Sequence, residues 1–557
     1  MIDERPTFDG LATFAADVCV IGGGPVGIVT ALELADQGKR VLLLETGGHK
    51  ATPEAQELQA ANNLQPGNHH DPRTTVARRL GGTSNLWGGR CLPHDAIDFQ
   101  DRPWVDQAAW PISQADLAPY LEKACTKLGA GRAVYRSPLP GVATDDAFSV
   151  DGLERWSNVP RTQNLHKAAL EQHPLLHVAL GATALGFEYD TAGRISAIDL
   201  HLEGQGKGRL AVSQVILAAG GNESTRLLLS EQRKRPHLFG DQLGRHYMAH
   251  VNGCIADITF DNQVLHDGLD FHVDDHGSYV RRRIMPSVTT QETNDIANVA
   301  FWPVVPEIAN PTHRSGPLSA VFLALSIAPL GRRLLAEPMR VKHVGEVPFH
   351  RGRHILNMLR DPLRTIGFAP WFLWKTKVAK PRLPGLFLKN PAQRYGLEYH
   401  SEHLPSADSR LTMSNETDRL GMPRLTIDLR FSDADAASVL RAHEALETWL
   451  NRNSLARLTY RKPAEARAQS ILEQAKHGAH QIGTIRMAST RADGVVDGNC
   501  RAFDIPNLHV ASTAVLRTSS HGNPTMTAVQ LGLRLAEQMC AVAVEPVTEK
   551  NQNAAAA

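Results

Sequence analysis

Two polar side chains near the C-terminal end of the chain have types and surroundings suited to chemistry. His480 lies in His477-Gly-Ala-His-Gln-Ile-Gly483, directly before a glycine turn, and an imidazole can accept a proton near neutral pH. Asn523 is followed by Pro524, and this order predicts the N-cap and first turn of an amphipathic helix that runs to about Val542. The N-terminus of that helix is a second place that could hold a polar or anionic group.

The segment 17–45 gives the strongest indication of the fold that positions these two residues. An apolar run ends in three glycines, a helix-like segment follows, and a second apolar run ends in Glu45, which is the pattern of one βαβ unit built around a dinucleotide. The glycines allow a tight turn and a close approach to a pyrophosphate, while a carboxylate at position 45 would accept from ribose hydroxyls and repel the 2′-phosphate of NADP. The motif alone leaves FAD and NAD open. The residues expected to contact the dinucleotide here are Gly22, Gly24, Pro25, Val26, Gly27 and Glu45.

A second glycine-rich segment, residues 79–91, is too rich in glycine and hydroxyl side chains to form a good helix or strand. It suits a backbone that wraps closely around a flat ligand. Leu86 and Trp87 at its centre argue against a flexible surface loop. The residues expected to contact the cofactor here are Arg79, Gly81, Gly82, Thr83, Asn85, Leu86, Trp87, Gly88 and Gly89.

Later segments supply the rest of the predicted architecture. Residues 175–219 alternate as strands do, and residues 214–230 form an apolar strand that runs into glycines and a helix. That unit would close a parallel sheet and bring a further glycine turn to the nucleotide. Residues 251–470 have many prolines and alternating runs, which indicates a substrate domain with an antiparallel sheet. The additional residues expected at the cofactor are Ala219, Gly220, Ser512, Asn523, Pro524 and Thr525.

Bulk properties exclude several functional classes. The 557 residues carry 59 Lys and Arg against 58 Asp and Glu, so no nucleic-acid partner is indicated. The six cysteines are scattered without a C-x-x-C pair, which indicates neither a zinc site nor a redox dithiol and fits a reducing compartment. No metal site is expected. The chain shows neither a secretory signal nor an apolar run that could span a bilayer, so we expect a cytoplasmic protein.

Residues 331–380 form an unusual block with 11 Lys or Arg against three acids, and it contains the aromatic run Phe368-Ala-Pro-Trp-Phe-Leu-Trp374. Basic residues beside exposed aromatics could touch a membrane surface or an electron acceptor. The interpretation preferred from the sequence is plainer: a helical cap packed by its aromatics, with the charges in solvent.

Several of these motifs together resemble the glucose–methanol–choline (GMC) oxidoreductases, and they occur in family order. The resemblance implies FAD-dependent oxidation of an alcohol, in which His480 acts as base and Asn523 contacts the substrate oxygen while hydride passes to flavin N5. His521 is a competitor for the second position, but the spacing from Glu537 favours Asn523. Residues 522–525 are most similar to the pyranose-oxidase and sugar-dehydrogenase branch. The matching segments are residues 17–45, 79–90, 215–229, 244–250, 402–405, 409–412 and 480–536.

Two departures from the family pattern are informative. Some sugar-oxidising relatives attach FAD covalently through a histidine just before the tryptophan of the Gly-Gly-Thr-Ser segment. The chain has Leu86 at that position, so non-covalent FAD is expected. Relatives often have an Asp near the position of Ser512 that contacts the flavin. The chain has no Asp there, so the resemblance does not predict this flavin contact.

The sequence therefore predicts an α/β protein with a Rossmann-like FAD domain built on a parallel sheet and a discontinuous α+β substrate domain containing an antiparallel sheet. The expected boundaries are 1–95, 171–250 and 471–545 for the FAD domain, 96–170 for a cap segment, 251–470 for the substrate domain, and 546–557 for a disordered tail.

The expected function is oxidation of a secondary hydroxyl of a sugar or glycoside, with O₂ or a quinone as the electron acceptor. One alternative is a quinone-dependent dehydrogenase of a non-sugar alcohol, which the aromatic run favours. An alternative of another class is a flavin-bound lyase on the same scaffold. The sequence leaves the oligomeric state open.

Overall fold

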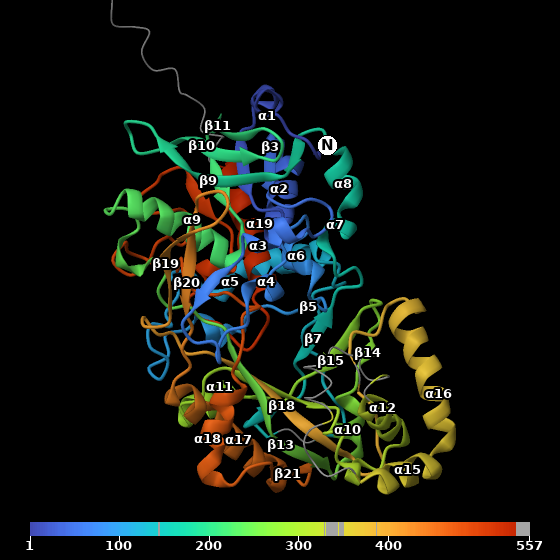
Figure 1. The fold of residues 1–557 in the computed structure, drawn as a ribbon. Helices are drawn as coiled ribbons and strands as arrows, with labels where there is room; N and C mark the ends of the chain where they lie inside the picture. The colour runs from blue at the N-terminus through green and yellow to red at the C-terminus, as the bar shows by residue number, and fades with distance from the viewer. Residues whose placement is uncertain (143–144, 328, 330–343, 345–349, 386, 542–557) are drawn as a thin grey trace, which may run out of the picture.

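The computed structural model describes residues 1–142, 145–327, 329, 344, 350–385 and 387–541. The predicted tail 546–557 and most of residues 331–349 lie outside these ranges. A six-stranded sheet occupies the upper part of Figure 1, and all of its pairings are parallel. Its strands, in spatial order, are β1 (Ile2–Asp3), β8 (Leu176–Leu180), β3 (Val41–Glu45), β2 (Val18–Ile21), β12 (Val215–Leu217) and β22 (Leu508–Val510).

Both faces of this sheet are covered, as continuous apolar strands require. Side chains alternate along β2, so Val18 and Val20 pack against helices α2 (Pro25–Asp36) and α19 (Thr525–Ala541). Cys19 and Ile21 point to the other face and belong to the largest core cluster. Helix α19 begins one residue after the predicted start, because the Pro524 carbonyl accepts the bond from Ala528 N and takes the capping position.

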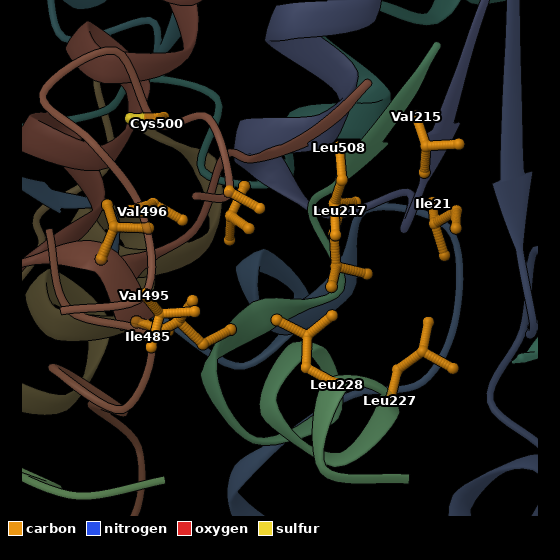
Figure 2. Close-up of a cluster of buried hydrophobic side chains, with 14 of the residues drawn as sticks. Ile21, Val215, Leu217, Leu227, Leu228, Ile485, Val495, Val496, Cys500 and Leu508 are labelled. Carbon is orange, nitrogen blue, oxygen red and sulfur yellow. The ribbon is translucent and has the colours of Figure 1, made fainter. Parts of the chain in front are cut away.

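Figure 2 shows part of that core. Leu227 and Leu228 of helix α9 (Gly220–Lys234) lie beneath Leu217 and Ile21 of the sheet. Ile485 and nearby side chains of the C-terminal segment complete the cluster from the side. The glycine turn before α9 and the C-terminal segment with His480 are therefore held on the same rigid body.

A second, antiparallel sheet lies in the lower part of Figure 1, and its strand order is β17–β18–β13–β21. Two helices cover one of its faces, and Tyr395, Leu397 and Tyr399 point into the core that they form with it. The opposite face is turned toward the FAD half of the molecule. The elements are β17 (Val299–Val304), β18 (Arg394–Glu402), β13 (His250–Phe260), β21 (Ala456–Tyr460), α17 (Asp433–Arg452) and α18 (Ala464–Gln474). The predicted fold class, a parallel sheet with a separate antiparallel one, is confirmed.

Helices α12 (Gly316–Ser326), α15 (Arg351–Arg360) and α16 (Pro362–Leu373) form a protruding edge at the lower right of Figure 1. The expectation that the aromatic run packs inward is wrong for its two tryptophans. Trp371 and Trp374 are exposed, and α16 fully buries none of its residues. In the described part of the chain, no helix has the length and apolarity to cross a bilayer.

The remaining elements complete the two halves and the connections between them. The other strands are β4 (Ala61–Asn63), β5 (Arg90–Cys91), β6 (Phe148–Ser149), β7 (Leu153–Trp156), β9 (Ala182–Tyr189), β10 (Ile195–Leu202), β11 (Gly206–Ala211), β14 (His272–Val273), β15 (Tyr279–Arg282), β16 (Met285–Pro286), β19 (Arg410–Thr417) and β20 (Pro423–Asp428). The other α-helices are α1 (Phe8–Phe14), α3 (Pro53–Glu57), α4 (Pro72–Thr75), α5 (Gln114–Leu117), α6 (Leu121–Lys127), α7 (Thr162–Leu165), α8 (Lys167–Gln172), α10 (Gln263–Gly268) and α11 (Val288–Thr293).

Candidate active site

A cavity of about 390 Å³ opens at the carboxyl ends of strands β2, β3, β12 and β22. This is the edge at which open parallel sheets bind their ligands. The two predicted catalytic residues and most of the predicted cofactor residues line it. They are Gly22, Gly24, Pro25, Val26, Glu45, Gly82, Thr83, Leu86, Trp87, Ala219, Gly220, His480, Ser512, Asn523, Pro524 and Thr525.

Six predicted cofactor residues do not line the cavity. A Cβ at Gly27 would lie 2.0 Å from the Gly22 carbonyl oxygen, so this glycine permits the contact between α2 and the turn. Asn85 holds its own loop by donating to the Leu80 and Gly82 carbonyls at 3.1 and 2.8 Å. The others are Arg79, which donates to the His49 carbonyl, and Gly81, Gly88 and Gly89.

Glu45 closes one end of the cavity. Its two carboxylate oxygens accept from the backbone N–H groups of Gly23 and Gly47, each at 2.8 Å. Burial raises the pKa of this carboxyl, against the lowering effect of those donors. Each oxygen keeps a second lone pair, so the side chain is positioned to accept a further hydrogen bond from a ligand.

The helix N-termini make the cavity suitable for an anion. Gly24, Pro25 and Val26 at the start of α2, and Pro524 and Thr525 at the start of α19, all line it. Unpaired N–H groups and the positive end of each helix dipole favour negative charge there. The site therefore offers two such termini within one cavity.

At the other end of the cavity, His480 and His250 are joined by a hydrogen bond of 2.7 Å between their Nδ1 atoms. His250 comes from the start of β13, 230 residues away in sequence. Its Nε2 lies 3.2 Å from the Ser519 carbonyl oxygen. His250 ends the segment 244–250 that resembles the GMC pattern, but sequence reasoning did not assign it a role, because nothing in that segment indicates a contact with His480.

These contacts select the tautomers of both rings. A carbonyl only accepts, so Nε2 of His250 carries the hydrogen. Burial lowers the pKa of both histidines well below the usual value, and neighbouring histidines and Arg90 lower it further. Both rings are therefore neutral at pH 7, Nδ1 of His250 accepts from Nδ1 of His480, and Nε2 of His480 is the nitrogen able to accept a proton.

Four histidines cluster here, with ring nitrogens of His250, His400, His477 and His480 all within 4.8 Å of one another. The set has the composition of a metal site. However, the direct bond between His250 and His480 occupies two of the candidate ligand atoms. The Arg90 guanidinium, which lowers the pKa values of three of these rings, adds a positive charge that disfavours a metal cation.

Asn523 lines the cavity and His521 does not. His521 is fully buried, and its Nε2 lies 2.8 Å from a carboxylate oxygen of Asp95 and 2.9 Å from Arg283. The His521 imidazole therefore belongs to a buried network of charged side chains with Asp95 and Arg283. Asn523 is half-buried and directed to the space that His480 also borders.

The face of the antiparallel sheet opposite its helices forms a wall beside this histidine cluster. Strand alternation and register place Asn252, Trp302, Glu398 and His400 on that face. The Trp302 and His400 rings lie 6.0 Å apart between centroids. The Asn252 side-chain oxygen is buried without a hydrogen-bond partner. Trp302 itself is buried, and the Arg90 and Arg281 guanidinium groups each lie 4.6 Å from its ring centroid, so the indole is engaged in cation–π contacts.

Comparison with known proteins identifies the family to which the chain belongs. Residues 17–296 match the family described as FAD dependent oxidoreductase, and residues 405–532 match GMC oxidoreductase. The chain is a GMC-type FAD-dependent oxidoreductase. The sequence-based assignment to the GMC family is thereby confirmed.

Two curated relatives of this GMC oxidoreductase come from Streptomyces. Paromamine 6'-oxidase of Streptomyces fradiae is 22% identical over 94% of the chain and 90% of that protein. The 6'''-hydroxyparomomycin C oxidase of Streptomyces lividus is 27% identical, over 42% of the chain and about half (53%) of that protein.

Solved structures show the same fold. Pyridoxine 4-oxidase from Mesorbium loti superposes with a TM-score of 0.53 at 17% identity, covering 94% of the chain and 99% of that structure. A formate oxidase gives 0.52 at 15% identity, covering 95% and 98%.

The residues present fit FAD. Gly24 lines the cavity, and a Cβ there would meet no atom within 4 Å, so the backbone is open to a close ligand. Residues 74–78 also line the cavity, together with Gln59, Gly221, Glu223 and Gln481. Residues 74–78 belong to none of the motifs expected at the cofactor, and an ion pair between Arg78 and Glu223 fastens this segment to α9.

Proposed function

We propose that the protein oxidises a hydroxyl group of a sugar or glycoside and that His480 takes the hydroxyl proton at Nε2. The observation that carries this proposal is the hydrogen bond from His480 to His250 at the edge of the FAD cavity. FAD, when bound, supplies the hydride acceptor of the reaction. The chain supplies the proton acceptor, the orientation of the alcohol and the exclusion of water.

His480 suits the role of base because it is neutral. Its lowered pKa keeps the lone pair available at pH 7, and a positioned base of this kind contributes about 10²- to 10⁴-fold in rate. Asn523 borders the same space and can donate from its amide to the developing alkoxide without competing for the proton. Together the two side chains hold the alcohol oxygen and remove its hydrogen.

The proposed substrate class rests on two observations. The sheet face beside His400 presents Glu398 and Asn252, whose buried side-chain oxygen has no hydrogen-bond partner, and such groups suit hydrogen bonding to sugar hydroxyls. Relatives named for oxidising paromamine and 6'''-hydroxyparomomycin C support a glycoside with amino groups.

The electron acceptor is proposed as O₂ or a quinone. We also propose a cytoplasmic location, which the six free cysteines support.

Anaerobic mixing with a panel of sugars, aminoglycosides and aliphatic alcohols tests this proposal. Bleaching of the flavin absorbance by a glycoside is the expected result. Turnover under air, and under argon with a quinone, then identifies the acceptor. Turnover with the flavin left oxidised would indicate a lyase, and bleaching by aliphatic alcohols alone would overturn the sugar assignment.

We also propose that FAD is bound non-covalently, because Leu86 lines the cavity where some relatives have a histidine. Acid precipitation of the purified protein should leave the yellow colour in the supernatant. As a matched comparison, Leu86→His provides a nucleophile at that position. Colour retained in the precipitate of the unmodified protein would contradict the proposal.

His250 should act as a positioning residue for His480. His250→Leu removes the acceptor of the Nδ1 bond, and the loss of a hydrogen bond of about 1–2 kcal/mol predicts flavin reduction about tenfold slower. His250→Asn keeps an acceptor oxygen near the position of Nδ1 and should restore most of the rate. Stopped-flow reduction measures both variants, with KM expected to change little. Equal slowing in the two variants, or a change in KM alone, would contradict the role.

A further inference from the structure

Helices α15 and α16, with the π-helical turn that follows them (Trp374–Val378), carry an unusual concentration of exposed apolar side chains. Nine of the eighteen exposed large hydrophobic side chains in the described part of the chain lie between residues 355 and 378. We call this set the α15–α16 surface. Its members are Ile355, Leu356, Leu359, Leu363, Ile366, Trp371, Leu373, Trp374 and Val378.

The exposed side chains of α16 follow the helical period. Leu363, Ile366 and Leu373 are 85%, 76% and 57% exposed, and their spacing places them on one side of the helix. Phe368 and Phe372, on the other side, are half-buried with their rings stacked at 5.6 Å. Helix α16 therefore turns its apolar stripe toward solvent, whereas the apolar stripe of an ordinary surface helix faces the protein core.

Polar contacts orient the preceding helix, α15. His354 of α15 is buried and contacts Ser319 Oγ of α12 at 3.1 Å and the Ala309 carbonyl oxygen at 3.2 Å. Asn357, one turn on, donates to the Pro311 carbonyl at 2.9 Å. Helix α15 is therefore fastened by its polar side, and its exposed Ile355, Leu356 and Leu359 face outward as a consequence of that packing.

The same segment is strongly basic. Residues 350–380 contain seven Lys or Arg and one acid, Asp361. Arg360 and Arg364 are exposed at the junction of the two helices, and the Lys375 ammonium lies 5.2 Å from the Trp374 ring centroid. Apolar side chains flanked by cations and by exposed tryptophans have the chemistry of helices that lie in the interface of an anionic bilayer.

We propose that the α15–α16 surface docks the enzyme peripherally on an anionic lipid bilayer. Leucine, isoleucine and tryptophan side chains would enter the boundary between headgroups and acyl chains, and the basic side chains would pair with lipid phosphates and carboxylates. The charge decides between this occupant and a second copy of the chain, because two such surfaces would bring like charges together. The docking is independent of the substrate assignment.

The test is sedimentation of the full-length holoenzyme with vesicles of phosphatidylcholine, with or without added phosphatidylserine. We expect binding to the anionic vesicles at least about tenfold stronger than to the neutral ones, and release at high salt. The double variant Leu363→Glu with Ile366→Glu should lose this binding. A matched control, Leu64→Glu with Val288→Glu, adds the same charge at exposed apolar positions elsewhere and should still bind.

Flavin content and turnover of a water-soluble substrate should be equal in all three proteins, so a failure of docking is distinguishable from a failure of the proposed activity. Wild-type protein that stays in the supernatant with anionic vesicles overturns the proposal, as does equal binding by the two double variants. A concentration-dependent dimer that Leu363→Glu with Ile366→Glu abolishes would reassign the surface to contact between copies and also overturn it.

Discussion

Replacing His480 by alanine is expected to slow reduction of the flavin by substrate about 10²- to 10⁴-fold. The reason is the loss of the only proposed proton acceptor at the alcohol oxygen, since His250 uses its Nδ1 toward His480 and its Nε2 toward Ser519. Anaerobic stopped-flow measurement at saturating substrate isolates this step. Flavin content and melting temperature on the same sample show whether the fold and the cofactor survive.

The histidine also sets the pH dependence. Because its pKa lies below the usual value, the neutral, proton-accepting form persists as the pH falls through 6.5. The acidic limb of kcat/KM should therefore lie below pH 6.5 in the wild type and disappear in His480→Ala. An acidic limb above pH 6.5, or a near-normal rate in the alanine variant, would exclude His480 as the base.

Substituting Gly24 by alanine is expected to weaken FAD binding without unfolding the protein. The residue has φ −80°, which alanine adopts, and its Cβ would meet no atom within 4 Å. The methyl group would instead narrow the space in the cavity where we expect the backbone to approach the pyrophosphate. We expect a loss of at least about tenfold in FAD affinity, equivalent to about 1.4 kcal/mol, by titration of the apoprotein.

Gly27→Ala makes the contrasting case. Its Cβ would lie 2.0 Å from the Gly22 carbonyl oxygen, so α2 or the turn must shift, at a cost of about 1–3 kcal/mol in stability. Thermal unfolding of the apoproteins should separate the two variants, with Gly67→Ala, where a Cβ also meets nothing, as the control. Wild-type FAD affinity in Gly24→Ala would show that the pyrophosphate does not lie at the start of α2.

The βαβ unit could be predicted because its signals are local. Apolar runs, glycines and the terminal acid all lie within residues 17–45, and they appear as β2, α2 and β3. His480 and Asn523 could be singled out for a similar reason, since each is next to its own turn or helix start. The structure places both on one cavity.

The partners of these residues could not be predicted in the same way. His250 meets His480 across 230 residues, and nothing in its immediate sequence indicates that contact. The exposure of the α15–α16 surface also could not be predicted from the sequence. Basic and aromatic residues suggested a packed cap, but Trp371 and Trp374 are exposed. Burial depends on which side of a helix is fastened, and in α15 His354 and Asn357 hold the polar side inward.

The amino-acid sequence by itself determined the dinucleotide-binding βαβ unit, because short-range periodicity and turn-forming residues encode it. FAD and the proposed roles of His480 and Asn523 came from the resemblance of several motifs to the GMC family. Only the tertiary structure decided which nitrogen of His480 can accept a proton, which residues lie beside the histidine cluster, and which side of α16 meets solvent. Those properties arise from contacts between elements far apart in the chain, which depend on how the helices and sheets dock.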